Sequence, residues 1–354
     1  MFFKEEDEKK SSMEEEIFEQ AIVLENILSS HVNDNNYILF DIPTDIRKVV
    51  LVASGSSYNC ARFAADLFGN IADIEAGAIY SSEFLLKSVI PHENDILYVF
   101  ITQSGETSDT NKALIKAKEF GMRTMCITNK KDSTIWQASD FKIDCCAGEE
   151  KSIAATKSLT AQMLCCTLLV LKYAAHKGID ITHYFDELRT LPEFVKKAYE
   201  LQDNIKEVAK ALSEYKNLVV TADGISYAFA KEASLKIKET SYINVYSSIL
   251  GEFMHGHVAV MNNKIAQIHI SIDDLSYTAI KNLNKIKEDY SSVLCIIGNT
   301  NEKVSEDYNI NINCESKLVK SFCTVIICQI LALEIAKKLK RNVDKPHGLN
   351  KVVK

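Results

Sequence analysis

Short apolar runs alternate along this chain with longer segments in which apolar positions recur every three or four residues. In the first half, the short apolar runs lie at residues 48–53, 74–80, 96–101, 123–129 and 141–146. Continuous apolar runs are typical of strands buried on both faces of a parallel sheet, whereas the 3.6-residue period indicates amphipathic helices. We expect a helix after each strand, the last being a long apolar one over residues 155–177. The first half is therefore predicted to be a parallel α/β domain.

The same pattern begins again after a polar-faced helical stretch. Strands are expected at residues 217–222, 243–247, 265–272, 293–298 and 310–314, with helices ending near 240 and over 277–288 and 318–339. The matching order and spacing predict a duplicated α/β domain. We expect a charged lead and helix at 1–40 (with the helix over 13–28 and a polar loop at 31–36), domains at 41–178 and 216–340, a helical connector at 179–215 and a tail at 341–354.

Small polar side chains follow two of the predicted strands. The first loop is Ser54-Gly55-Ser56-Ser57, and the second supplies Thr102, Gln103, Ser104 and Thr107. In a doubly wound sheet such loops share one edge, where helix N-termini favour anions. The alternative is that these residues are ordinary helix N-caps. Two such loops within about fifty residues favour a shared anion pocket of the kind that holds a phosphate group.

Composition narrows the class of protein. The 354 residues carry a net charge of −7, which argues against a sequence-independent grip on nucleic acid. Residues 1–16 are charged and have no apolar core of a signal peptide. The longest apolar runs, 164–171 and 325–333, are too short to span a bilayer. Most of the ten cysteines lie in apolar runs, so we expect reduced, buried thiols and a cytoplasmic protein.

Charged and titratable residues gather in the second half. Glu232, Lys236 and Glu239 share one helix face at i, i+4 and i+7, a pattern that is typical of a surface ladder of ion pairs. His255 and His257 flank a glycine, but no third ligand stands at a recognised metal spacing, so we expect no metal. Histidine also suits acid–base chemistry near neutral pH. A lysine near a chain end, such as Lys351, is ordinarily solvated.

Six stretches spread over both halves carry a resemblance. They are 54–59 (SGSSYN), 102–110 (TQSGETSDT), 154–157 (AATK), 235–242 (LKIKETSY), 251–256 (GEFMHG) and 344–351 (DKPHGLNK). From about residue 13 to the end, the chain resembles the isomerase part of glucosamine-6-phosphate synthase (glutamine–fructose-6-phosphate aminotransferase). That part consists of two tandem SIS (sugar isomerase) domains, each a doubly wound, mostly parallel five-stranded sheet flanked by helices.

The resemblance implies a role for each matching residue. Glu239 falls on the proton-shuttling glutamate, and Lys236 on the lysine that supplies positive charge. His255 falls on the ring-opening histidine, which the neighbouring subunit of a homodimer contributes. Lys351 falls on a lysine implicated in ring opening and also in a Schiff base with the open ketose. The sugar phosphate would be held by Ser56, Ser57, Thr102, Gln103, Ser104 and Thr107. Neither a metal nor an organic cofactor is implied.

Some positions depart from the family. Ala155 stands where the family usually has Ser, His257 where it has Pro, and His347-Gly348 where it has Arg-Asn. Met1 is followed by Phe rather than by the cysteine nucleophile of a glutaminase domain. We therefore expect no glutaminase activity within this chain. The changes leave the phosphate loops and the Glu/His/Lys set in place, so they bear on which sugar is bound.

Three functions are compatible with these residues. The first is an amino-sugar phosphate deaminase/isomerase that converts glucosamine 6-phosphate to fructose 6-phosphate and ammonia, or the reverse with free ammonia. The second is a deglycase acting on an adduct such as fructoselysine 6-phosphate, for which Ala155 leaves room. The third is a regulatory module that senses a sugar phosphate without turnover. The Glu239, His255 and Lys351 set favours catalysis.

Overall fold

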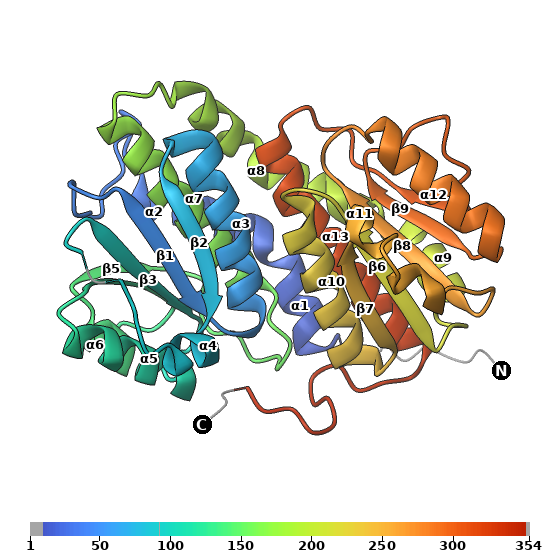
Figure 1. Ribbon diagram of the computed structural model, residues 1–354, viewed down its shortest axis with the longest axis horizontal. Helices are drawn as coiled ribbons and strands as arrows, with labels where there is room; N and C mark the ends of the chain where they lie inside the picture. The colour runs from blue at the N-terminus through green and yellow to red at the C-terminus, as the bar shows by residue number, and fades with distance from the viewer. Residues whose placement is uncertain (1–9, 92, 352–354) are drawn as a thin grey trace, which may run out of the picture.

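The structure is a computed structural model that describes residues 10–91 and 93–351. Two parallel sheets, each of five strands, lie side by side with helices on their faces (Figure 1). The first sheet has the order β2-β1-β3-β4-β5. Its strands are β1 (Lys48–Ala53), β2 (Glu75–Tyr80), β3 (Ile96–Thr102), β4 (Arg123–Thr128) and β5 (Phe141–Asp144). Every residue of the central strand β3 is buried, as its unbroken apolar run predicts.

The second sheet repeats this arrangement in the order β10-β9-β8-β6-β7. Its strands are β6 (Asn217–Ala222), β7 (Asn244–Ile249), β8 (Ile265–Ser271), β9 (Leu294–Gly298) and β10 (Tyr308–Ile310). The two-domain α/β class predicted from the sequence is confirmed. One strand differs: the run expected at 310–314 pairs with β9 only over Tyr308–Ile310.

Helices fill the connections of the first half and the linker. They are α1 (Ser12–Phe18), α2 (Gln20–His31), α3 (Gly55–Ala72), α4 (Ser81–Leu86), α5 (Ser108–Glu119), α6 (Thr134–Ala138), α7 (Lys157–His176), α8 (Thr182–Glu200) and α9 (Gln202–Leu212). The single helix expected over residues 13–28 is in fact two helices, because the helix is interrupted at Glu19. The polar loop expected from residue 31 starts later, since His31 ends α2 and is buried. Part of the expected charged lead, residues 1–9, lies outside the described residues.

The second half has its own set of helices. They are α10 (Ser226–Ser241), α11 (Leu250–Phe253), the 3₁₀ helix η1 (His257–Val260), α12 (Tyr277–Tyr290) and α13 (Lys317–Lys338). The two halves pack through α3 and α10, where the rings of Phe63 and Phe229 lie 5.6 Å apart. Figure 1 shows these helices face to face between the sheets, with the C-terminal segment returning beneath the first half.

The two halves are related by a constant difference in residue number over the strands that border the cavity edges. β1 begins at Lys48 and β6 at Asn217, while β3 begins at Ile96 and β8 at Ile265, an offset of 169 residues in both cases. The last turns of α3 and α10 also correspond, because Asp73 and Tyr242 both cap their helices in the left-handed conformation. Equivalent positions in the two halves can therefore be compared residue by residue.

The apolar helices α7 and α13 form the centre of the two domains. Their 20 and 22 residues are long and apolar enough to cross a membrane, so the expectation that the apolar segments are too short was wrong on length. However, these helices are buried inside the fold, as core helices are. The burial is 89% for the most apolar stretch of α7 and 100% for that of α13. All ten cysteines are free, and only Cys146 is partly exposed, as the sequence predicts.

Candidate active site

One cavity brings together most of the residues singled out from the sequence. It has a volume of about 800 Å³ and lies where the carboxyl ends of β1 and β3 meet helix α10 and the C-terminal tail. The expected substrate-binding residues line it: Ser56, Ser57, Thr102, Gln103, Ser104, Thr107 and Ala155. Lys236, Glu239 and Lys351 line it as well, although they come from the other half and from the tail. Tandem loops at one sheet edge are where doubly wound folds bind ligands.

The two polar loops lead directly into helices. Gly55 opens α3 with φ of +57°, and Thr107 is the N-cap of α5. The hydroxyls of Thr102 and Thr107 lie 3.1 Å apart, and the Ser104 hydroxyl accepts a 3.1 Å hydrogen bond from the Glu106 N–H. The loops thus present neutral donors beside the N-termini of an 18-residue and a 12-residue helix. This arrangement suits an anion.

Gly105 fixes the shape of the second loop. Its φ is +67°, and a Cβ at this position would lie 2.1 Å from Oγ of Ser133. The neighbouring carboxylate of Glu106 accepts hydrogen bonds from the N–H and hydroxyl of Thr134, at 2.7 and 2.9 Å. Any residue larger than glycine would push the loop away from the α6 segment.

Glu232, Lys236 and Glu239 line one buried face of α10. Nζ of Lys236 lies 2.5 Å from Oε2 of Glu239 and 3.6 Å from Oε1 of Glu232. The side chains of Lys236 and Glu232 are 1% and 2% exposed, whereas that of Glu239 is 21% exposed at the cavity. The surface ladder that the spacing suggests is therefore wrong, because α10 turns this face inward against α3. Ser56 and Asn59 of α3 donate to the Glu232 carboxylate at 3.0 and 2.7 Å.

Burial and charge act against each other in this cluster. Burial alone would lower the pKa of Lys236, but the carboxylates of Glu239 and Glu232 outweigh it and raise that pKa. Lys236 therefore stays an ammonium ion. Burial raises the pKa of Glu232 in spite of the opposing charge of Lys236 and the hydrogen bond from Asn59. The result is a fixed positive charge in a dry site next to a carboxylate that reaches the cavity.

The tail lysine is paired with a buried carboxylate, although its own side chain is 26% exposed. Nζ of Lys351 lies 2.5 Å from Oε2 of Glu150 and 2.6 Å from the carbonyl oxygen of Ser152. Glu150 has a side chain with no exposed surface. The loop that carries it, between β5 and α7, also places Ile153 and Ala155 in the cavity wall.

His255 alone among the expected catalytic residues lies away from the cavity. It is exposed in the turn that follows α11, and its N–H bonds to the carbonyl of Glu252 at 2.9 Å. His257 lies 3.3 Å from the hydroxyl of Tyr246 through Nδ1. Within the described parts of the chain, no group of three or more His, Cys, Asp or Glu residues is arranged to hold a metal.

Sequence reasoning missed two buried residues at the site. Asn59 lies in a stretch that matched the family, but only the contact between α3 and α10 shows that it binds Glu232. Glu150 lies next to an exposed glutamate, Glu149, and nothing in the sequence tells these two apart.

A second cavity occupies the equivalent edge of the second sheet. It has a volume of about 530 Å³ and is lined by Leu67, Asn70 and Asp273, among others. With the 169-residue offset between the halves, Leu67 corresponds to Lys236, Asn70 to Glu239 and Asp273 to Ser104. A carboxylate takes the place of a hydroxyl, and neither the lysine nor the glutamate is present. The duplicated cavity therefore lacks the charged pair that the first cavity holds.

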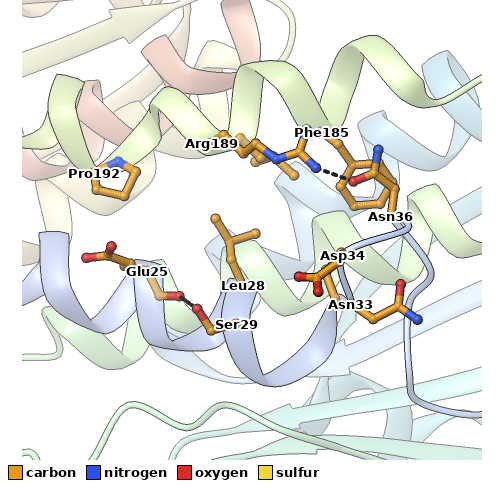
Figure 2. A pocket seen from close by; sticks show the side chains of 11 residues that line it. Glu25, Leu28, Ser29, Asn33, Asp34, Asn36, Phe185, Arg189 and Pro192 are labelled. Carbon is orange, nitrogen blue, oxygen red and sulfur yellow. Dashed lines mark hydrogen bonds between the residues drawn. The ribbon is translucent and has the colours of Figure 1, made fainter.

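A groove between α2 and α8 is a third candidate (Figure 2). Its volume is about 360 Å³, and Arg189 on one wall donates a hydrogen bond to Asn36 on the other. Ser29 donates to the carbonyl of Glu25 at 3.0 Å. None of the expected site residues lies there. The first cavity is therefore the candidate active site.

Comparison with known proteins identifies the family to which both halves of the chain belong. The sequence profile of the SIS domain matches residues 44–172 and 211–336, one segment in each half. The chain belongs to the SIS domain family. This SIS protein spans about 58% of the length of the curated relatives it matches. They include the glutamine–fructose-6-phosphate aminotransferases of Campylobacter jejuni (29% identical over 346 residues) and Aquifex aeolicus (30% over 347 residues), matched over 96% and 97% of this chain.

Solved structures show the same double SIS fold. The C-terminal domain of glucosamine-fructose-6-phosphate aminotransferase from Francisella tularensis has a TM-score of 0.89 at 24% identity, covering 96% of this chain and 99% of that one. Glucosamine-6-phosphate deaminase from Thermotoga maritima has a TM-score of 0.77 at 22% identity, covering 97% and 99%. Both halves of the chain and their relative placement are thus shared with these proteins.

Proposed function

We propose that this SIS protein is an amino-sugar phosphate deaminase/isomerase that interconverts glucosamine 6-phosphate with fructose 6-phosphate and ammonia. The observation that carries the proposal is the Lys236–Glu239 pair, 2.5 Å apart, which lines one cavity together with the two polar loops. The loops would hold the phosphate of the substrate, and the pair would act on the carbon atoms at the other end.

The chemistry needs one carboxylate that reaches two adjacent carbons. Glu239 would remove the proton from C2 of the open-chain sugar and return it to C1. A second proton would pass from the C2 amine to O1, so that the aldehyde becomes an alcohol and the amine becomes an imine. Lys236, held as a cation, would stabilise the negative charge that develops between the two transfers. Water would then add to C2 and release ammonia. Ring opening beforehand would use Lys351 and His255.

A dimer completes this proposal. His255 does not line the cavity of its own chain, so we propose that a second copy brings its His255 to the site. Mixing Glu239→Gln and His255→Ala variants tests this arrangement. If the site is shared, the mixed dimer regains activity that neither parent has, because one of its two cavities contains both intact residues. If the two variants, each inactive alone, remained inactive after mixing, the proposal of a shared site would be refuted.

The direct test of the function is an assay for ammonia and fructose 6-phosphate after incubation with glucosamine 6-phosphate. Both products should form in equal amounts, and Glu239→Gln should abolish them. The deglycase alternative is favoured by Ala155, which presents only a methyl group to the cavity. A panel of phosphorylated amine adducts of fructose decides between them: release of the amine faster than of ammonia would favour the deglycase. Tight sugar-phosphate binding with no turnover would favour a sensing module.

A further inference from the structure

One wall of the candidate active site, the β5–α7 loop (residues 145–156), has no regular secondary structure. The loop forms neither helix nor strand, yet Ser152, Ala154 and Thr156 are at most 1% exposed. Backbone N–H groups in a buried segment of this kind need hydrogen-bond acceptors from elsewhere in the fold. Because Ile153 and Ala155 of this loop line the cavity, the groups that supply these acceptors also fix the shape of the cavity wall.

Two buried carboxylates hold the β5–α7 loop. The first, Glu150, lies within the loop and accepts N–H groups at the start of α7 at 2.9 and 3.0 Å. The second, Glu16, is 3% exposed and comes from helix α1, 135 residues before Lys151. Its Oε1 accepts the N–H of Lys151, and its Oε2 accepts that of Ser152 at 3.2 Å. Glu16 therefore fixes the two residues directly before Ile153 in the cavity wall.

The N-terminal helices also hold the far end of the loop. The carboxylate of Glu19, between α1 and α2, accepts a 2.7 Å hydrogen bond from Nζ of Lys157, the first residue of α7. The side-chain oxygen of Gln20 accepts a 2.7 Å hydrogen bond from the hydroxyl of Thr160. One short stretch at the start of the chain thus binds both the loop and the helix that follows it.

The C-terminal tail completes the arrangement. The carboxylate of Asp344 accepts the N–H groups of Ser12 and Met13 at 2.9 and 3.0 Å, at the start of α1. Farther along the tail, Nζ of Lys351 donates to the carbonyl oxygen of Ser152 at 2.6 Å. Helix α1, the β5–α7 loop and the tail therefore each contact the other two, in the region where the tail passes below α1 in Figure 1.

We propose that Glu16 is a positioning residue of the candidate active site, and that α1, the β5–α7 loop and the tail form one unit that holds two walls of the cavity together. The wall at Ile153 and Ala155 then depends on a side chain that does not itself line the cavity. The predicted effect on turnover rests on the proposed function, whereas the predicted effect on the loop does not.

Glu16→Gln tests the positioning role, with Glu15→Gln as the matched control on the exposed neighbour. The substitution replaces one acceptor oxygen by an NH₂ donor, which faces the backbone N–H groups of the loop. We expect hydrogen exchange over residues 145–156, measured by mass spectrometry, to become about tenfold faster or more in Glu16→Gln and to stay unchanged in Glu15→Gln. Equal exchange in the two folded variants would overturn the proposal.

Kinetics separate positioning from a general loosening of the fold. The hydrogen bonds of Glu16 go to the β5–α7 loop and not to the two polar loops. We therefore expect Glu16→Gln to lower kcat/KM for glucosamine 6-phosphate about tenfold or more, while affinity for inorganic phosphate stays within about twofold. A parallel loss of phosphate affinity would contradict a positioning role.

Asp344→Asn tests whether the tail and the loop form one unit, and it serves as the second variant if Glu16→Gln does not fold. It takes one acceptor away from the start of α1 and leaves the contacts of Ser152 in place. We expect faster exchange over residues 145–156 here too, and the double variant should exceed the faster single variant by no more than about twofold. Exchange at the parental rate would refute the coupling.

The failure of this inference can be told apart from the failure of the proposed function. If no sugar phosphate is turned over by the parent protein, the proposed function fails. The exchange measurements on Glu16→Gln, Glu15→Gln and Asp344→Asn need no substrate, so they still decide whether α1 holds the loop and the tail.

Discussion

The side-chain amide of Asn59, in the first half of the chain, donates a 2.7 Å hydrogen bond to Oε2 of Glu232 in the second half. Ser56 donates to the other oxygen of the same carboxylate at 3.0 Å. Helix α3, which begins at the first polar loop, is thereby tied to helix α10, which carries Lys236 and Glu239. The two parts of the proposed site are held in one geometry by this buried contact.

Asn59→Ala should weaken the contact between α3 and α10 and lower the stability of the protein. It leaves one oxygen of a buried carboxylate without its donor, which costs about 1–3 kcal/mol. We expect the free energy of unfolding, measured by urea denaturation, to fall by that amount. Asn70→Ala, an exposed asparagine on the same helix, is the control and should change it by less than about 0.5 kcal/mol. Equal effects of the two substitutions would contradict the role given to Asn59.

Glu239→Gln should remove catalysis without unfolding the protein. The side chain keeps its shape but can no longer accept a proton, so kcat with glucosamine 6-phosphate should fall about a hundredfold to ten-thousandfold. Affinity for inorganic phosphate, which we propose that the two polar loops bind, should stay within about threefold. Glu207→Gln, on the exposed face of α9, provides the control. A Glu239→Gln variant with the activity of the parent would sink the mechanism.

Lys236→Ala should lower both stability and activity. The substitution leaves the carboxylates of Glu232 and Glu239 without their shared cation, and breaking a buried ion pair costs about 3–5 kcal/mol. Lys238→Ala, two residues along on the exposed face of α10, removes the same charge from the surface and should be nearly neutral. Denaturation curves of the two variants provide the comparison.

Gly105→Ala should distort the second polar loop, which we propose binds phosphate. Its added Cβ would stand 2.1 Å from the Ser133 hydroxyl, so the loop must move as well as bear its left-handed φ of +67°. Gly121→Ala is the matched control, because its φ is +68° and open space surrounds the added atom. We expect about 1–2 kcal/mol of destabilisation from Gly121→Ala. A loss of phosphate affinity, measured by calorimetry, should be seen with Gly105→Ala alone.

His269 should make the protein sensitive to acid. Burial lowers the pKa of this histidine from 6.5 to about 4. Below pH 6.5 the unfolded chain therefore binds a proton that the folded chain refuses, and stability falls as the pH drops from 6.5 to 4. The loss should reach about 3 kcal/mol. His269→Asn, which retains a polar partner for Thr221, should flatten the dependence in that range. An unchanged slope would contradict this assignment.

Local sequence patterns determined most of the fold. Apolar runs such as Leu97–Phe100 leave no solvent-facing side, so they indicate buried parallel strands, and small polar residues at their ends mark the loops. The apolar pattern predicted wrong boundaries where the local sequence has little influence on where an element ends. The strand expected at 310–314 pairs only at Tyr308–Ile310, because edge pairing depends on the neighbouring strand. The break at Glu19 between α1 and α2 has no proline or glycine to announce it.

The sequence by itself also indicated which loops could hold an anion, since two hydroxyl-rich loops precede helices at one edge of the predicted sheet, whereas one such loop alone is typical of an ordinary helix N-cap. Only the tertiary structure decided which charges are buried. The spacing of Glu232, Lys236 and Glu239 fits a solvated helix face equally well, and Glu149 and Glu150 look alike in the chain. Packing of α3 on α10 and the return of the tail to Glu150 remove these groups from water. Helical and strand periods report which residues share a face, whereas the partner of that face is set by contacts far apart in sequence.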